Sequence, residues 1–199
     1  MIRNIVFDLG NVLISFKPDK FLEQKGYQKE TRDTILSDIF RSEEWLSLDK
    51  GEFTTEEVIN AISLKSSLKR DKITALFNSR TEIMFPLTEN VQLLPALKEK
   101  GFKLYYLSNF HDDIFDDLKI SYAFFSLFDG GIISARVKLS KPDSRIYSVF
   151  LETYNLIAND TLFIDDSEIN ILAAESLGMK GIHYKEKMSL EKAIWSYLK

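Results

Sequence analysis

The sequence predicts an α/β fold in which a doubly wound, Rossmann-like parallel sheet forms the core. The apolar run Ile5-Val6-Phe7 leads straight into Asp8, which is typical of a strand buried on both faces. From residue 90 onward, short apolar runs alternate with helical patterns, the order that strand–helix–strand units produce. Polar residues follow several of these runs, where the carboxyl ends of parallel strands meet.

The composition is that of an ordinary globular chain and excludes several classes of function. Of 199 residues, 45% are hydrophobic and 28% are charged, the usual balance for a folded domain. The 26 Lys and Arg against 30 Asp and Glu give a net charge of −4, so we expect no nucleic-acid partner. The absence of Cys excludes disulfides, thiolate metal sites and a Cys nucleophile.

The sequence also gives no sign of a membrane or secretory segment. No apolar run approaches the ~18 residues that a membrane span needs, and residues 1–4 lack the pattern of a signal peptide. We therefore expect a cytoplasmic location and no membrane partner. The sequence does not predict the oligomeric state.

The segment that follows the first strand has a helical character. Apolar residues recur at helical spacing over residues 34–40 and again over 58–62. Thr54 and Glu57 fit a capping box that opens the second of these helices. We find no strand pattern here, and we expect a helical insertion at residues 15–88 within a core made of residues 1–14 and 89–199.

The remainder of the core is expected to alternate between helices and strands. In chain order we predict a helix over 91–100 ended by Gly101, a strand over 103–107, a helix opened by 111–113, a strand near 124–134, a helix from Pro142 to about Tyr154, a strand over 161–164, a helix over 168–178, a strand over 181–184 and a terminal helix capped by Ser189.

Polar residues that suit a single binding site stand at the ends of these strands or at a helix start between them; they are Asp8, Ser108, Asn109, Lys141, Asp165 and Asp166. In a doubly wound sheet such positions gather at one edge. Carboxylates crowded together repel one another unless a cation joins them, and oxygen ligands without His or Cys favour Mg²⁺. A lysine and a hydroxyl suit a phosphoryl group.

These motifs resemble, in order, the four motifs of the haloacid dehalogenase-like hydrolase superfamily; they are Asp8-Leu9-Gly10-Asn11-Val12, Ser108-Asn109, Lys141-Pro142 and Asp165-Asp166. The first motif is also similar to the branch that includes bacterial α-glucose-1-phosphate phosphatase. The resemblance covers essentially the whole chain and implies that residues 15–88 form the helical cap of this family.

The resemblance implies a role for each residue of the first and fourth motifs. Asp8 would be the nucleophile that forms an aspartyl-phosphate. Mg²⁺ would be held by Asp8, the backbone carbonyl of Gly10 and Asp166. Asp165 would bind the metal directly, or hydrogen-bond a metal-bound water or Lys141.

The resemblance also implies how the phosphoryl group is held. Ser108 and Asn109 would bind its oxygens, and Lys141 would offset the charge on the nucleophile and the phosphate. Asn170 would steady the water shell of the metal. The alternative for Asn170 is an amide on the helix surface.

Gly10 departs from the pattern of the family. In most of its phosphatases, the residue two positions after the nucleophile is a second Asp, which protonates the leaving group and later activates water. Such help contributes about 10²–10⁴-fold to a rate. Three interpretations stay open: substrates with good leaving groups, a substitute acid such as His111, or loss of turnover. The alternative for His111 is an exposed histidine in a turn.

The sequence therefore favours a Mg²⁺-dependent phosphatase that acts on a small phosphate monoester, with a sugar phosphate such as a sugar 1-phosphate as the expected substrate. A first alternative is a catalytically weak phosphate-binding or regulatory protein of the same fold. A second is a 2-haloacid dehalogenase, since those members of the superfamily also lack the second Asp. They need no metal and carry no Asp pair in the fourth motif, so Asp165-Asp166 favours phosphate and Mg²⁺.

Aromatic residues of the insertion could face the substrate, although their helical spacing favours a place in the cap core; they are Phe16, Phe21, Phe40, Trp45 and Phe53. The side chains of a cap select the substrate while the core supplies the chemistry. The sequence alone does not identify the phosphate ester.

Overall fold

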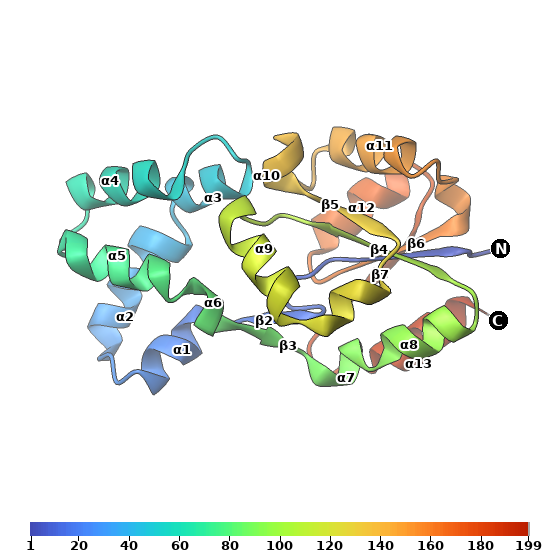
Figure 1. Cartoon of the computed structure of the whole chain (residues 1–199), viewed down its shortest axis with the longest axis horizontal. Helices are drawn as coiled ribbons and strands as arrows, with labels where there is room; N and C mark the ends of the chain where they lie inside the picture. Colours follow the sequence, from blue (N-terminus) through green and yellow to red (C-terminus); the bar gives the residue numbers. More distant parts are fainter. Residues whose placement is uncertain (199) are drawn as a thin grey trace.

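The computed structural model describes residues 1–198, and a parallel sheet forms the centre of the molecule (Figure 1). Its strands lie in the order β5–β4–β1–β6–β7. Their bounds are β1 (Asn4–Phe7), β4 (Lys103–Ser108), β5 (Gly130–Ile133), β6 (Thr161–Asp165) and β7 (Lys180–His183). Since β1 pairs with β4 on one side and β6 on the other, Asp8 stands at the middle of the carboxyl edge of the sheet.

Both faces of the sheet are covered, which explains why β1 is apolar throughout. Successive side chains of a strand point to opposite faces. Ile5 and Phe7 therefore pack in one hydrophobic cluster, and Val6 packs in another. The first cluster includes α8 (Leu93–Glu99), α9 (Asp112–Ser121) and α13 (Leu190–Tyr197), and the second includes α11 (Ser144–Thr153) and α12 (Glu168–Ser176). The predicted doubly wound α/β fold is confirmed.

The insertion consists of short helices packed around a hydrophobic cluster of their own. They are α1 (Pro18–Gln24), α2 (Lys29–Ile35), the π-helical turn η1 (Leu36–Phe40), α3 (Glu43–Asp49), α4 (Thr55–Lys65), α5 (Arg70–Asn78) and α6 (Arg80–Ile83). The capping box that opens α4 is present, because Thr54 and Glu57 each accept a hydrogen bond from the backbone of the other. Figure 1 shows these helices beside the edge at which the strands of the core end.

The expectation that this segment carries no strand is wrong. Two short strands join it to the core: β2 (Ile14–Phe16) pairs antiparallel with β3 (Met84–Pro86). Each has three residues, which is too short for the alternation that marks a strand in a sequence. The pairing arises because the two ends of the insertion meet, and the sequence does not show that meeting.

The core differs from prediction at three further points. Residues 124–128 belong to the 3₁₀ turn η2 (Ala123–Leu127), and the strand that follows is β5. The helix expected over 91–100 is divided into α7 (Thr88–Val91) and α8. The helix expected from Pro142 is α11, which starts at Ser144 because Asp143 caps it by accepting a hydrogen bond from the Arg145 amide at 2.9 Å.

Short elements complete the chain. They are α10 (Ser134–Val137) and the 3₁₀ turn η3 (Ala158–Asp160). Ser189 caps α13 as expected, accepting from the Lys192 amide at 3.3 Å. Across residues 1–198, no helix is long and apolar enough to cross a membrane.

Candidate active site

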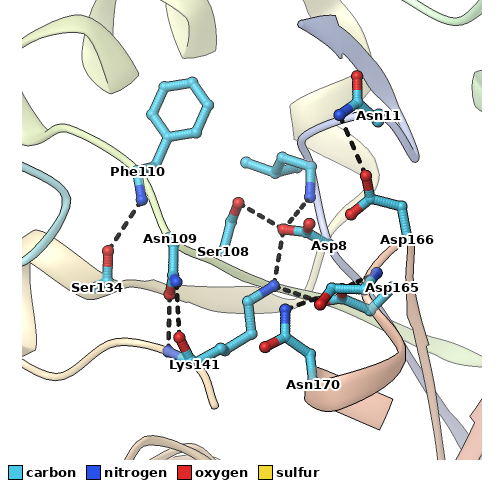
Figure 2. A network of polar contacts seen from close by, with 12 residues as sticks. Asp8, Asn11, Ser108, Asn109, Phe110, Ser134, Lys141, Asp165, Asp166 and Asn170 are labelled. Carbon is cyan, nitrogen blue, oxygen red and sulfur yellow. Dashed lines mark hydrogen bonds and ion pairs between the residues drawn. The ribbon is translucent and has the colours of Figure 1, made fainter. Parts of the chain in front are cut away.

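Asp8 is held at the end of β1 by contacts that fall on one of its two carboxylate oxygens (Figure 2). Oδ1 accepts hydrogen bonds from the Leu9 amide at 2.8 Å and from the Ser108 hydroxyl at 2.6 Å. The Lys141 ammonium lies 2.9 Å from the same oxygen. A Cβ added to Gly10 would lie 4.0 Å from the other oxygen, Oδ2. One oxygen of Asp8 is thus fixed, and the other faces Gly10.

The fourth strand-end motif joins this group through Lys141. The Lys141 ammonium lies 2.6 Å from Asp165 Oδ2. Asp165 Oδ1 accepts from the backbone amide of Ser167 at 2.8 Å and from the side-chain Nδ2 of Asn170 at 3.0 Å. Both oxygens of Asp165 are therefore engaged. Asn170 is only 9% exposed, so the alternative of an amide on the helix surface is wrong.

The residues expected to hold the metal come together at this edge. Asp8, Asp165 and Asp166 each offer an oxygen within 4.8 Å of the others. Asp165 is fully buried, whereas Asp166 is exposed and accepts a hydrogen bond from the Asn11 amide at 3.1 Å. Because both oxygens of Asp165 are engaged, whereas the contacts of Asp8 fall on Oδ1, Asp8 and Asp166 are the carboxylates best placed to face a cation.

The charges of the site explain why a cation fits it. Burial raises the pKa of Asp8 to about 7, against the lowering effect of the Lys141 charge and with a further rise from Asp165. Burial lowers the pKa of Lys141, but the attraction of Asp8 and Asp165 outweighs it, so the pKa of Lys141 lies above its usual range. One lysine thus balances only part of the negative charge of three carboxylates. Hard oxygen donors short of positive charge suit Mg²⁺.

Asn109 holds the backbone of Lys141. Its Oδ1 accepts from the Lys141 amide at 2.8 Å, and its Nδ2 donates to the Lys141 carbonyl at 3.0 Å. Phe110, which follows Asn109, is also held, because its backbone amide donates to Ser134 Oγ at 2.9 Å. These hydrogen bonds fix the loop after β4 to the loop that contains Lys141 and to the start of α10 (Figure 2).

A cavity of about 180 Å³ opens over Asp8. The core contributes Asp8, Asn109 and Asp166 to its lining, and the insertion contributes Trp45 and Asp49. The five aromatic residues singled out in the insertion divide into three kinds. Phe16 and Trp45 line the cavity and also pack in the cluster inside the insertion. Phe21 and Phe40 pack in that cluster without lining the cavity, and Phe53 is half exposed.

His111 lies in the wall of this cavity and is 2% exposed. The alternative of an exposed turn histidine is therefore wrong. Its Nδ1 lies 3.2 Å from the Arg80 guanidinium, and its ring centroid lies 4.4 Å from that of Trp45. Its Nε2 lies 3.2 Å from Asp49 Oδ1 without the alignment of a hydrogen bond. A guanidinium can only donate, so Nδ1 accepts and Nε2 carries the proton.

Sequence reasoning missed some residues of the site. Asn11, with φ of 54°, adopts the left-handed conformation, which Asn tolerates better than most residues. In that position its side chain reaches Asp166 and accepts from the Phe16 amide at 3.1 Å. The Gly10-Asn11 pair was the available signal. Asp49 offered none, because only the folding of the insertion brings it to the cavity.

The chain is similar to several known proteins. It is 28% identical over 184 residues to the sesquiterpene phosphatase astK of Aspergillus oryzae, covering 92% of this chain and 90% of that protein. Its structure matches the HAD family enzyme BT-2542 of Bacteroides thetaiotaomicron in complex with magnesium and inorganic phosphate, with a TM-score of 0.77, 25% identity and coverage of 97% and 99%.

A more distant match is the L-2-haloacid dehalogenase of Xanthobacter autotrophicus, with a TM-score of 0.69, 17% identity and coverage of 98% and 83%. At this identity the match shows a shared fold. The sequence model of the haloacid dehalogenase-like hydrolases matches residues 2–178, and the chain therefore belongs to this family of hydrolases.

Proposed function

We propose that this hydrolase is a Mg²⁺-dependent phosphatase that cleaves a small phosphate monoester through an aspartyl-phosphate on Asp8. The observation that carries the proposal is the buried contact of Lys141 with both Asp8 and Asp165, next to Asp166. A charged group of this kind stabilises negative charge that develops on a phosphoryl group. The Aspergillus oryzae relative is a phosphatase, and the Bacteroides thetaiotaomicron structure holds magnesium and phosphate, which supports the same chemistry here.

The reaction has two steps on phosphorus. In the first, a carboxylate oxygen of Asp8 forms a bond to phosphorus while the bond to the ester oxygen breaks, and the electron pair leaves with the alcohol oxygen, which must gain a proton. In the second, water attacks phosphorus, the bond to Asp8 breaks and inorganic phosphate is released. Ser108 and Lys141 orient Asp8 for this attack through their contacts with Oδ1.

The proposed metal site consists of Asp8, the backbone carbonyl of Gly10 and Asp166. When bound there, Mg²⁺ would neutralise the crowded carboxylates and draw charge from the phosphoryl oxygens. We propose that Asp165 and Asn170 support this site by positioning its residues and do not have to bind the metal themselves. Asn170 donates to Asp165, and Asp165 in turn holds the Lys141 ammonium.

We assign the phosphoryl oxygens to Ser108 and Lys141, and we assign to Asn109, expected from the sequence to bind them too, the positioning of Lys141. Ser108 and Lys141 both reach Asp8, so a phosphoryl group bound to Asp8 would lie beside them. Asn109 contributes by positioning Lys141, because both atoms of its amide bond the Lys141 backbone.

We further propose that residues 15–88 act as a cap over a core made of residues 1–14 and 89–199. The support is the cavity over Asp8, which side chains of both parts line. In this arrangement the core fixes the phosphoryl half of the substrate and the cap selects the alcohol half.

The choice of the alcohol half starts from Gly10 and from the family resemblance. The resemblance to the α-glucose-1-phosphate phosphatase branch and the missing acid at Gly10 both suggest a sugar 1-phosphate, because an anomeric oxygen is less basic than an ordinary sugar alkoxide.

The test of the proposed function is phosphate release from p-nitrophenyl phosphate with Mg²⁺ present. The Asp8→Asn variant should keep the fold, since the replacement is nearly isosteric, and should lose turnover. A phosphate-binding protein without turnover would release no phosphate in either form. Equal rates in the two forms, with contaminating phosphatase excluded, would contradict the covalent role of Asp8.

A further inference from the structure

We propose that the alcohol half of the substrate is apolar, so that this site hydrolyses the phosphate monoester of a hydrocarbon alcohol. The inference rests on the proposed phosphatase function, and it replaces the sugar 1-phosphate suggested by Gly10 and by the family resemblance with a different substrate class. It follows from the walls of the cavity over Asp8 and from the hydrogen bonds already made by the polar groups there.

Apolar side chains form the walls of the cavity; they are Ile14, Phe16, Trp45, Met84, Phe110 and Ile114. Phe16 stacks on Trp45 with ring centroids 5.8 Å apart and an angle of 26° between the rings. Trp45 and Met84 are each less than a tenth exposed. Asp8, Asp166 and Asn109 also line the cavity, so the pocket combines the charged groups of the sheet edge with apolar walls.

Most of the polar side chains in this lining are already occupied. Both atoms of the Asn109 amide bond the Lys141 backbone. Asn11 donates to Asp166 and accepts from the Phe16 amide. Nδ1 of His111 faces Arg80. Among the described residues that line the cavity, apart from Asp8 and Asp166, this leaves the Asp49 carboxylate and His111 Nε2, and Nε2 is itself buried.

A polyhydroxylated sugar would therefore bury several hydroxyls without partners, which is unfavourable. A hydrocarbon chain needs no such partners and gains from contact with the wall. One added methylene in an apolar pocket changes kcat/KM by about 10–200-fold. The wall thus favours an alkyl or alkenyl group over a sugar ring of similar size.

A simpler explanation is that these residues only form the hydrophobic core where the insertion meets the sheet. Ile14 and Met84 do belong to the core cluster, and Trp45 belongs to the cluster of the insertion. A packed interior, however, leaves few voids larger than a water molecule. Here the apolar surfaces line a cavity that opens onto the proposed nucleophile.

The test compares ethyl, butyl and hexyl phosphate with glucose 6-phosphate, measured as kcat/KM from phosphate release. All four esters release a primary alcohol, and the three alkyl alcohols have nearly equal basicity. If the lack of an acid at Gly10 slows departure of the alcohol, it therefore slows the three alkyl esters to the same extent. We expect kcat/KM to rise at least about tenfold from ethyl to hexyl phosphate, and glucose 6-phosphate to fall below hexyl phosphate.

Adjacent residues of β3 provide a matched pair of variants. Met84 lines the cavity, whereas Phe85 is 50% exposed. Met84→Gln places an amide in the wall at similar length and should lower the ratio of hexyl to ethyl phosphate kcat/KM about tenfold. Phe85→Gln should leave that ratio unchanged. Circular dichroism of both variants checks that they are folded.

Calorimetry measures the binding of ethylphosphonate and hexylphosphonate to the wild-type chain with Mg²⁺. This test of the pocket needs neither turnover nor a variant. The apolar wall predicts tighter binding of hexylphosphonate. Equal binding of the two, or a kcat/KM that is flat with chain length, would overturn this inference while leaving the phosphatase intact. If the phosphonates discriminate but no ester is hydrolysed, the proposed function fails and the apolar pocket stands.

Discussion

The ammonium of Lys141 lies 2.9 Å from the carboxylate of Asp8, and these side chains are 1% and 10% exposed. A buried pair of this kind is costly to break from one side, because the partner left behind keeps its charge without compensation, at about 3–5 kcal/mol. The pair therefore has a structural role as well as the proposed catalytic one. It also ties two segments distant in sequence to one point of the sheet edge.

Replacing Lys141 with Met should reveal both roles. We expect Lys141→Met to lower the free energy of unfolding by about 3 kcal/mol and to reduce kcat by about 10²–10³-fold. Urea unfolding and phosphate release measure the two effects. Lys119→Met, on the exposed side of α9, is the control and should change neither. A Lys141→Met variant with the kcat of the wild type would contradict the proposed role.

Removal of Mg²⁺ should abolish turnover and lower thermal stability. A ligand at 100 times its dissociation constant stabilises a fold by about 2.7 kcal/mol, which corresponds to about 5–10 °C in a chain of this size. We therefore expect Mg²⁺ to raise Tm by about that amount and EDTA to reverse it. Ca²⁺ should inhibit, because it accepts more ligands at longer distances.

The Asp166→Asn variant tests the metal site and should need more Mg²⁺ for the same rise in Tm. Asp160→Asn, at the opposite edge of the sheet, is the control and should behave like the wild type. Turnover that persists in EDTA would contradict a metal-dependent site.

The sequence predicted the parts of the site that follow from strand ends. Asp8, Ser108 and Asp165 stand directly after or at the end of buried apolar runs, and parallel strands bring such positions together whatever their distance in sequence. The contact of Lys141 with Asp165 was expected only from the family resemblance, because Lys141 lies between α10 and α11 and not at a strand end. The predicted α/β fold rests on the same alternation of strands and helices.

The sequence could not predict contacts that depend on how the insertion folds back on the core. His111 is buried because Arg80, Asp49 and Trp45 close around it, and each of these residues comes from the insertion. The strands β2 and β3 are missed for the same reason. Local sequence patterns predict which residues form a helix. They do not predict which helix of the insertion packs against which loop of the core, and that packing determines these contacts.

Adding an acid at position 10 should alter the dependence of the first step on the leaving group. A Cβ at Gly10 would meet Asp8 Oδ2 at 4.0 Å, an ordinary contact, so Gly10→Asp should fold normally. We expect the wild-type phosphorylation rate to fall steeply as the alcohol becomes more basic, with aryl phosphates fastest. Gly10→Asp should raise the rates of alkyl phosphates by about 10²-fold or more and change aryl phosphates least.

Single-turnover kinetics on a graded series of phosphate esters, in both proteins, measures this dependence. Gly10→Ala is the control, because it adds the Cβ without the carboxyl group. A flat dependence in the wild type would mean that another group already donates the proton. His111 would then be the first residue to replace, since it lines the cavity.

The contact between insertion and core should depend on pH through Asp113. This carboxylate accepts from Arg80 at 2.7 Å and from Thr55 at 2.6 Å, and both partners belong to the insertion. Burial raises the pKa of Asp113, but the Thr55 hydrogen bond and the Arg80 charge outweigh it, so this pKa lies below its usual range. A lowered pKa in the folded state stabilises the fold above the unfolded pKa of about 4, and the stabilisation is lost as the pH falls through the folded value.

We therefore expect Asp113→Asn to lower the free energy of unfolding by about 1 kcal/mol at pH 7, since the side chain is half exposed. The difference from the wild type should shrink once the pH falls below about 4. Urea unfolding at several pH values measures it, and Asp117→Asn, on the exposed side of the same helix, should show no such change. A constant difference across this range would contradict the ionic contact.

If Asp8 is the nucleophile, an aspartyl-phosphate forms on it during turnover and can be trapped. The chain is mixed with a phosphorus-labelled aryl phosphate and Mg²⁺, quenched with acid within a single turnover, and digested to locate the label. We expect the label on the peptide that contains Asp8 and none in the Asp8→Asn variant. Phosphate release by the wild type with no label on that peptide, together with turnover by Asp8→Asn, would contradict the account.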